Sequence, residues 1–186
     1  MLDVLRPGVL DGMRVLLAGG DAVVGARLGA LGAEVLPLRA ALDDEDAVIA
    51  EVGSAGRIDV VVVAGGGPFA AAGGGLAGLR AAVDGGWNAV RAVANACWLQ
   101  DGAAGGKAVL IAPPPGAGAH AAAAGAALEN TARTVSVEWS RFGVRTTAIR
   151  PGDAASGHEV AELVAFLASP AGDYATGCAF TLTGAG

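Results

Sequence analysis

The chain has 186 residues and a mass of 17.9 kDa, the size of one domain with its own hydrophobic core. Hydrophobic residue types make up 53% of it and charged types 16%, which excludes an intrinsically disordered chain. The formal net charge of −6 leaves no basic face for nucleic acid. The two cysteines, Cys97 and Cys178, are too few for a disulfide framework or a metal-ligand set, so we expect no metal.

The mean hydropathy of +0.53 comes from small residues and not from a membrane span. The longest apolar stretch without glycine, Ala108 to Pro115, is far shorter than the ~20 residues that a spanning helix needs. Near the start of the chain, Asp3, Arg6 and Pro7 interrupt any apolar signal region. We therefore expect a cytoplasmic protein with neither a membrane nor a nucleic-acid partner.

Short apolar runs alternate with helix-type segments along the chain. Strands are predicted over residues 13–18, 33–38, 58–64, 107–112, 144–149 and 178–182. Helices are predicted over residues 22–31, 47–52, 76–99, 120–139 and 159–167, with a glycine-rich loop before residue 76. This alternation predicts one α/β domain over residues 1–186, with a doubly wound, mostly parallel sheet and helices on both faces.

Five segments resemble the short-chain dehydrogenase/reductase family, in the family's order. Ile58-Asp-Val-Val-Val-Val-Ala-Gly resembles its fourth strand with the Asn-Asn-Ala-Gly motif, and Trp87-Asn-Ala-Val-Arg-Ala-Val resembles its central helix. Residues 125–145 are similar to the helix that carries the catalytic Tyr and Lys and to the strand after it. Ala148-Ile-Arg-Pro-Gly is similar to that strand's end, and residues 167–184 resemble the C-terminal signature. The resemblance implies a Rossmann-like fold and NAD(P)-dependent oxidoreductase chemistry.

The family's proton relay has no counterpart at the matching positions. In the family a Lys four residues after a Tyr lowers the pKa of that Tyr, which then transfers the proton. The alignment places Ala121 at the Tyr position and Gly125 at the Lys position. The family's Ser falls at Pro113 and its Asn at Ala94, with Asn95 beside it. We therefore expect no catalytic residue among these positions.

The composition gives the same result without an alignment. Tyr174 is the only tyrosine and Lys107 the only lysine, so no Tyr-x-x-x-Lys pair exists in the chain. His120 lies beside the lost Tyr position and is the one candidate for a substitute proton donor. The alternative for His120 is an ordinary residue at a helix start.

The cofactor loop also departs from the resemblance. The family's glycine-rich loop lets the backbone approach a pyrophosphate at a helix N-terminus. Gly19, Gly20 and Gly25 are the remnant here, in a segment about four residues, or one helical turn, shorter than the family pattern. Asp21 adds an anion near the phosphate position, and Arg39 is the nearest candidate for choosing between NAD and NADP. We expect a vestigial loop and no cofactor.

Two further parts of the family's fold are reduced. A helix and a strand are missing beyond the second predicted strand, and only Asp153 to His158 separate Gly152 from the last helix, where the family has a substrate lid. The loss of relay, loop and lid together indicates a framework that persists without catalysis. We expect a non-catalytic subunit that oligomerises with a catalytically complete short-chain dehydrogenase or with itself.

The resemblance implies subunit contacts through the two central helices. Small residues there permit close approach, and Trp is enriched at hot spots, with packing in the core or on the sheet as the alternative for the three Trp residues. The candidate interface residues are Trp87, Ala96, Trp98, Leu128, Ala132 and Trp139. Two alternatives stay open. One is a degenerate NAD(P)-dependent oxidoreductase with His120 as proton donor. The other is a small-molecule binding module that uses the cleft at the carboxyl ends of the strands.

Overall fold

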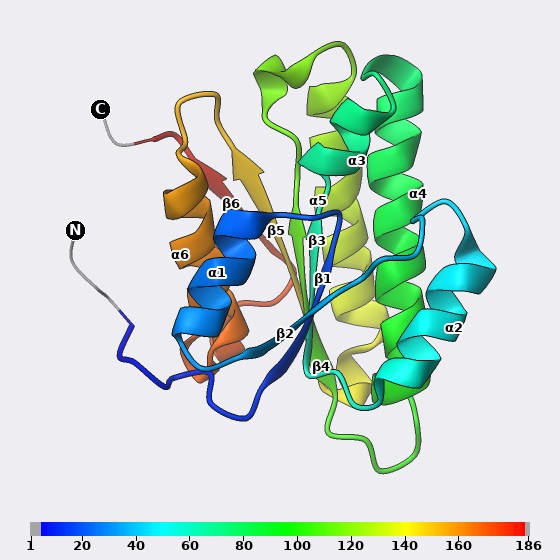
Figure 1. Ribbon diagram of the computed structural model, residues 1–186, viewed down its shortest axis with the longest axis vertical. Coiled ribbons are helices and arrows are strands. Elements are labelled where there is room, and N and C mark those ends of the chain that lie inside the picture. The colour runs from blue at the N-terminus through cyan, green and yellow to red at the C-terminus, as the bar shows by residue number, and fades with distance from the viewer. Residues whose placement is uncertain (1–4, 185–186) are drawn as a thin grey trace.

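Six parallel strands form one sheet in the order β2-β1-β3-β4-β5-β6 in the computed structural model, which describes residues 5–184 (Figure 1). The strands are β1 (Arg14–Ala18), β2 (Glu34–Pro37), β3 (Val60–Ala64), β4 (Gly106–Ile111), β5 (Val144–Pro151) and β6 (Cys178–Leu182). The predicted doubly wound α/β fold is therefore confirmed.

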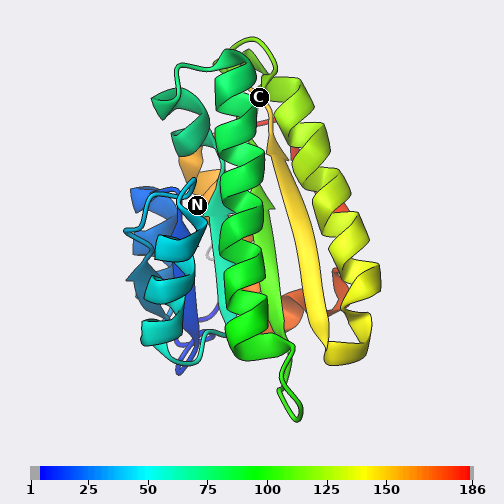
Figure 2. The same cartoon turned by 90° about the vertical axis from the view of Figure 1, so that its right-hand side faces the viewer.

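Helices cover both faces of the sheet. Helices α1 (Ala22–Ala30) and α6 (Gly157–Ala168) lie on one face, and α2 (Glu45–Ala55), α4 (Gly75–Val93) and α5 (Ala121–Glu138) lie on the other (Figures 1 and 2). Side chains alternate between the two layers, as in any strand: Val60 and Val62 face α1 and α6, whereas Val61 and Val63 face α4 and α5. Among residues 5–184, no helix combines the length and the apolar character that crossing a bilayer requires.

One helix, α3 (Gly66–Ala71), stands where a glycine-rich loop was expected. Its two glycines and Pro68 disfavour a helix by propensity. Tertiary packing outweighs that preference, because the Phe69 ring is fully buried in a small cluster between α3, α4 and α5. Gly78 permits this contact, since a Cβ there would lie 2.7 Å from the Phe69 carbonyl oxygen and 3.0 Å from the ring.

Strand β2 is an edge of the sheet and leads almost directly into α2, which agrees with the expected loss of a strand and helix. Helix α2 packs against α4, where Asn88 Nδ2 donates to the Leu42 carbonyl oxygen at 2.9 Å and Arg91 pairs with Glu45. The loop after β2 is fixed by Glu51, whose carboxylate accepts from the backbone N–H of Arg39 at 2.9 Å. The other sides of α4 pack on the sheet and on α5.

The only lysine has a structural role at the amino end of the sheet. Lys107 Nζ donates to the carbonyl oxygens of Leu167, Ala168 and Ser169 at 3.3, 3.2 and 2.6 Å, and pairs with Asp173. These carbonyls belong to the end of α6, where a helix leaves oxygens without partners. Burial lowers the pKa of Lys107, against the opposing effect of Asp173. The only tyrosine, Tyr174, is 98% exposed.

Gly106 and Gly53 provide a matched test of packing. A Cβ on Gly106 would overlap the buried indole of Trp98, whose Nε1 donates to the Ile58 carbonyl oxygen at 2.8 Å. Gly53, on the exposed side of α2, has nothing within 4 Å of its Cβ position. We expect Gly106→Ala to lower the free energy of unfolding by about 2–3 kcal/mol, and Gly53→Ala to raise it by about 0.5–1 kcal/mol. Urea denaturation measures both, and equal effects would contradict the packing of Trp98.

Candidate functional site

A cleft runs along the carboxyl ends of the central strands, where the chain changes its direction of winding between β1 and β3. Its outer hollow has a volume of about 500 Å³ and its central hollow about 230 Å³. Gly20 and Gly67 line both, so the hollows form one cleft. The outer hollow is lined by Gly19, Gly20, Leu38, Ala40, Leu42, Asp43, Gly67, Pro68, Ala71, Ala72 and Ala81.

The turn between β1 and α1 requires glycine because two backbones meet there. Gly19 has a φ of +84° and lies so close to the Ala64 carbonyl oxygen that a Cβ would overlap it. Gly67 approaches the Gly19 carbonyl oxygen in the same way. Gly20 has a φ of +65°, and nothing lies within 4 Å of its Cβ position, so its backbone opens onto the cleft. Gly25 lies inside α1, where its Cβ position is 3.2 Å from Leu17, and serves helix–strand packing.

Asp21 fills the place that an anion would take at the N-terminus of α1. Its Oδ1 accepts from the backbone N–H groups of Val23 and Val24, both at 3.0 Å. In dinucleotide folds such N–H groups face the pyrophosphate. The short turn therefore caps the helix with its own carboxylate, and a phosphate has to compete with that carboxylate for the same donors.

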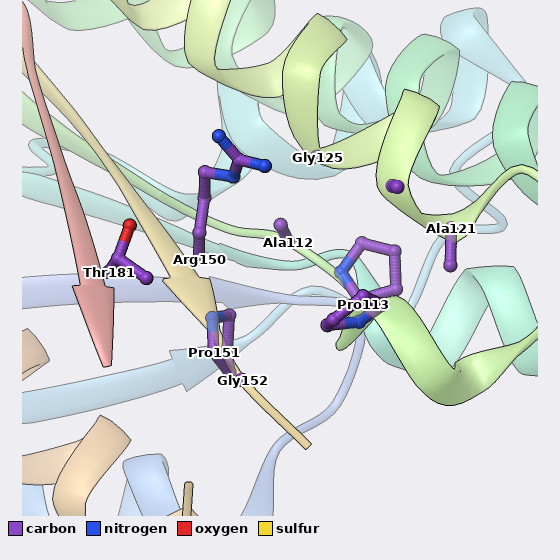
Figure 3. Close-up of a pocket in the computed structure, with 10 residues that line it drawn as sticks. Ala112, Pro113, Ala121, Gly125, Arg150, Pro151, Gly152 and Thr181 are labelled. Atoms are coloured by element: carbon purple, nitrogen blue, oxygen red, sulfur yellow. The ribbon is translucent and has the colours of Figure 1, made fainter. Parts of the chain in front are cut away.

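Beyond the central hollow lies a third hollow of about 180 Å³, the Arg150 pocket (Figure 3). It is lined by Ala112, Pro113, Pro115, Ala121, Ala122, Gly125, Arg150, Pro151, Gly152 and Thr181. The fold thus brings together three of the positions that the resemblance assigned to the relay, Pro113, Ala121 and Gly125.

The other two candidates for chemistry lie outside the pocket. Ala94 is fully buried in the core, and Asn95 beside it is exposed. His120 is an exposed residue at the start of α5, with a φ of +68° and no capping hydrogen bond from its side chain. Of the residues that line the three hollows, none is a histidine or tyrosine. No group there matches the proton donor of the resemblance.

Arg150 is the charged side chain of this pocket, and the sequence analysis did not single it out. It extends from β5 toward α5, where its Nε lies 3.8 Å from the Cβ position of Gly125 (Figure 3). Its Nη1 donates to Glu129 Oε2 at 3.1 Å, and Arg133 donates to the other carboxylate oxygen at 2.8 Å. The hydrogen bond from Arg133 has the largest effect on the pKa of Glu129 and lowers it; burial opposes that effect, and the hydrogen bond from Arg150 lowers the pKa further. Glu129 therefore stays ionised and holds the guanidinium of Arg150 beside the pocket.

Asp153 ties together the loops that border the Arg150 pocket and the central hollow. Its Oδ1 accepts from the backbone N–H of Gly116 at 2.6 Å, which joins the loop after β5 to the loop after β4. Both hollows include Ala112, Pro151 and Gly152. The sequence analysis predicted the loss of the substrate lid. The short segments that this hydrogen bond joins stand where the resemblance implies that lid.

The predicted interface is partly wrong. Trp98, Leu128 and Ala132 are each 1% exposed, because they face the sheet and fill the core of the chain itself. They cannot contact another subunit. Trp87 and Trp139 stack on each other across α4 and α5 with ring centroids 6.0 Å apart, and Trp87 is 37% exposed. Of the predicted interface residues, these two and the exposed Ala96 remain available for contact with another subunit.

No protein-family model matches the sequence, and no curated protein matches it. Solved structures do match. The citronellol catabolism dehydrogenase AtuB of Pseudomonas aeruginosa is 26% identical, with a TM-score of 0.76 over 96% of each chain. BdcA of E. coli is 24% identical, with a TM-score of 0.76 over 94% of this chain and 100% of that one. A short-chain dehydrogenase/reductase of Serratia marcescens is 21% identical, with a TM-score of 0.73 over 93% and 96%.

The expectation that no cofactor belongs here is corrected by these neighbours. BdcA was also solved with NADPH, a 7α-hydroxysteroid dehydrogenase with NADH, and a gluconate 5-dehydrogenase of Burkholderia cenocepacia with NADP. With TM-scores of 0.74 to 0.77 over nearly the whole chain, this protein has the fold of the short-chain dehydrogenase/reductases.

Proposed function

We propose that this chain binds a nicotinamide dinucleotide but transfers no proton by itself. In this proposal it serves as a non-catalytic subunit beside a catalytically complete short-chain dehydrogenase or a second copy of itself. The observation that carries the proposal is the composition of the Arg150 pocket. Pro113, Ala121 and Gly125 stand together at the positions that the resemblance assigns to Ser, Tyr and Lys. None of these three side chains can give or accept a proton.

The cleft fits a dinucleotide along most of its length. The outer hollow, with Leu38, Leu42 and Pro68 in its walls, offers apolar surface for an adenine ring. Gly20 and Gly67 connect the outer hollow to the central hollow. Because neither residue has a side chain, a phosphate could approach the backbone closely there. The central hollow, walled by Ile111 and other apolar residues, would hold the nicotinamide, the group that supplies hydride chemistry when bound.

The charge at the outer hollow favours NAD(H) over NADP(H). Asp43 lines this hollow, and Asp44, Glu45 and Asp46 follow it directly. A carboxylate can accept hydrogen bonds from a ribose 2′-hydroxyl, whereas a 2′-phosphate beside it meets like charge. Arg39, which the sequence offered for this choice, is exposed and does not line the hollow.

The stacked Trp87 and Trp139 support the oligomeric part of the proposal. Large aromatic side chains that remain partly exposed are typical anchors of protein interfaces. Here they join the outer faces of α4 and α5, the two helices that the resemblance assigns to subunit contacts (Figure 2). A partner at this face would leave the cleft open, because the cleft lies at the carboxyl ends of the strands.

Titration with NADH and NADPH tests the proposal directly. We expect NADH to bind at least tenfold more tightly than NADPH, and Asp43→Asn to reduce that ratio, because the variant removes the charge that faces a 2′-phosphate. Asp46→Asn, three residues further along the chain and outside the outer hollow, is the control and should keep the ratio. Bound NADH should not be oxidised by added carbonyl compounds above the buffer rate. Turnover by the isolated chain would contradict the non-catalytic role.

Asp21 should limit the affinity for the dinucleotide. Asp21→Asn keeps a side-chain oxygen as helix cap but removes the negative charge beside the expected pyrophosphate. We expect it to tighten NADH binding about tenfold, since two like charges near a protein surface repel by a few kcal/mol at contact distances. Asp101→Asn, in a turn at the opposite end of the sheet, makes the same change in net charge and should have no effect. Equal or weaker binding by Asp21→Asn would show that the pyrophosphate lies elsewhere.

Association through the Trp87–Trp139 face can be measured by light scattering. We expect Trp87→Arg to weaken self-association, or binding to a catalytically complete partner, by at least tenfold, because an unpaired charge is costly in a buried interface. Val23→Arg is the control, since Val23 is also exposed but lies on α1, on the opposite face of the sheet. If the wild-type chain stays monomeric and captures no partner, the subunit role is wrong.

A further inference from the structure

The Arg150 pocket carries a net positive charge on one wall. Arg150 and Arg133 share the single carboxylate of Glu129, so the three side chains together have a formal charge of +1. Arg150 is 43% exposed although it lies in the sheet. Within residues 5–184, Glu129 is the only hydrogen-bond partner of its side chain, through Nη1. The Nε and Nη2 edge of the guanidinium is therefore free to donate.

The other walls of the pocket are apolar. Pro113, Ala121 and Pro151 offer no hydrogen-bonding side chain, and Gly125 offers no side chain at all (Figure 3). Thr181 contributes a hydroxyl from β6 on the side of Arg150. The volume of about 180 Å³ equals the share of about six water molecules in the liquid. A ligand of roughly six non-hydrogen atoms, with one anionic end and an apolar body, matches this space.

We infer that the Arg150 pocket is a binding site for a short organic monocarboxylate, held by the free edge of the Arg150 guanidinium. Two parallel N–H···O bonds from such an edge match the two oxygens of a carboxylate. The apolar walls then receive the hydrocarbon part of the ligand. This inference goes beyond the proposed function, since it requires neither a dinucleotide nor a partner subunit.

Inorganic phosphate matches the Arg150 pocket less well than a monocarboxylate does. It would meet the guanidinium with the same geometry, but it has no apolar part to cover Pro113, Ala121 and Pro151. A dianion would also exceed the single positive charge of the pocket wall. Asp153, at the adjoining rim, already accepts from Gly116 and adds negative charge there.

Calorimetric titration of the full, cofactor-free chain with butyrate tests the inference. Butyrate has six non-hydrogen atoms, and butyramide has the same size without the charge. We expect butyrate to bind with a millimolar or lower Kd and butyramide to bind at least tenfold more weakly. Arg150→Met, which keeps the length of the side chain and leaves Glu129 paired with Arg133, should abolish the preference for butyrate. Equal binding of the two probes, no binding of butyrate, or stronger binding of phosphate would overturn the inference.

A second variant keeps Arg150 and fills the space instead. The Cβ position of Gly125 lies 3.4 Å from Ala112 and 3.8 Å from Arg150 Nε, so Gly125→Leu extends into the pocket without a backbone clash. It should prevent butyrate binding, whereas Ala123→Leu, on the exposed side of the same helix, should not. Circular dichroism confirms that each variant is folded. Retention of butyrate binding by Gly125→Leu would contradict the site. Titration with NADH reports on the proposed function separately, so either result can fail without the other.

Discussion

The reversal of winding between β1 and β3 determines where every other part of the molecule lies. Both neighbours of β1 are parallel to it, but the chain reaches β2 through α1 on one face and β3 through α2 on the other. The two connections separate at the carboxyl end of β1, and the cleft opens there. The contact between Gly19 and the start of α3 is possible only because neither residue at that contact has a side chain. A Cβ at Gly19 would overlap the Ala64 carbonyl oxygen and lie 3.2 Å from Pro68, so it would push the β1–α1 turn away from the end of β3 and the start of α3, on which the shape of the cleft depends.

In the Arg150 pocket, a different side chain occupies the space beside Gly125, and its chemistry differs from that of the lysine that the resemblance implies there. Gly125 leaves room on α5 where the resemblance implies a Lys, and a guanidinium from β5 reaches that room from the other side. Glu129, one helical turn further along α5, holds it there. A guanidinium keeps its proton in proteins, so it supports binding of anions and not transfer of a proton. This is why the pocket suits a ligand site better than a relay.

The sequence predicted the sheet well, because runs of β-branched residues such as Val60 to Val63 end sharply at glycine or proline. It missed α3, whose stability comes from the burial of Phe69 and not from propensity. It also missed Arg150, because the role of that residue depends on Glu129, 21 positions earlier, and on an absent side chain at Gly125. Trp98 was misplaced for a local reason. The last turn of α4 continues as a π-helix over Ala94–Trp98, which changes the angular spacing and turns the indole into the core.

Asp21 connects the shortened turn to the energetics of cofactor binding. A carboxylate within the chain is always available to the N–H groups of Val23 and Val24, so a pyrophosphate has to displace it to gain them. The displaced carboxylate must then find water or another donor, and the helix loses a cap worth about 1 kcal/mol. Under the proposed function, the apolar outer hollow has to supply the free energy that this turn does not. The affinity for the dinucleotide would then depend more on the adenosine end than on the phosphates, in contrast to folds in which the glycine-rich loop provides the main anion site.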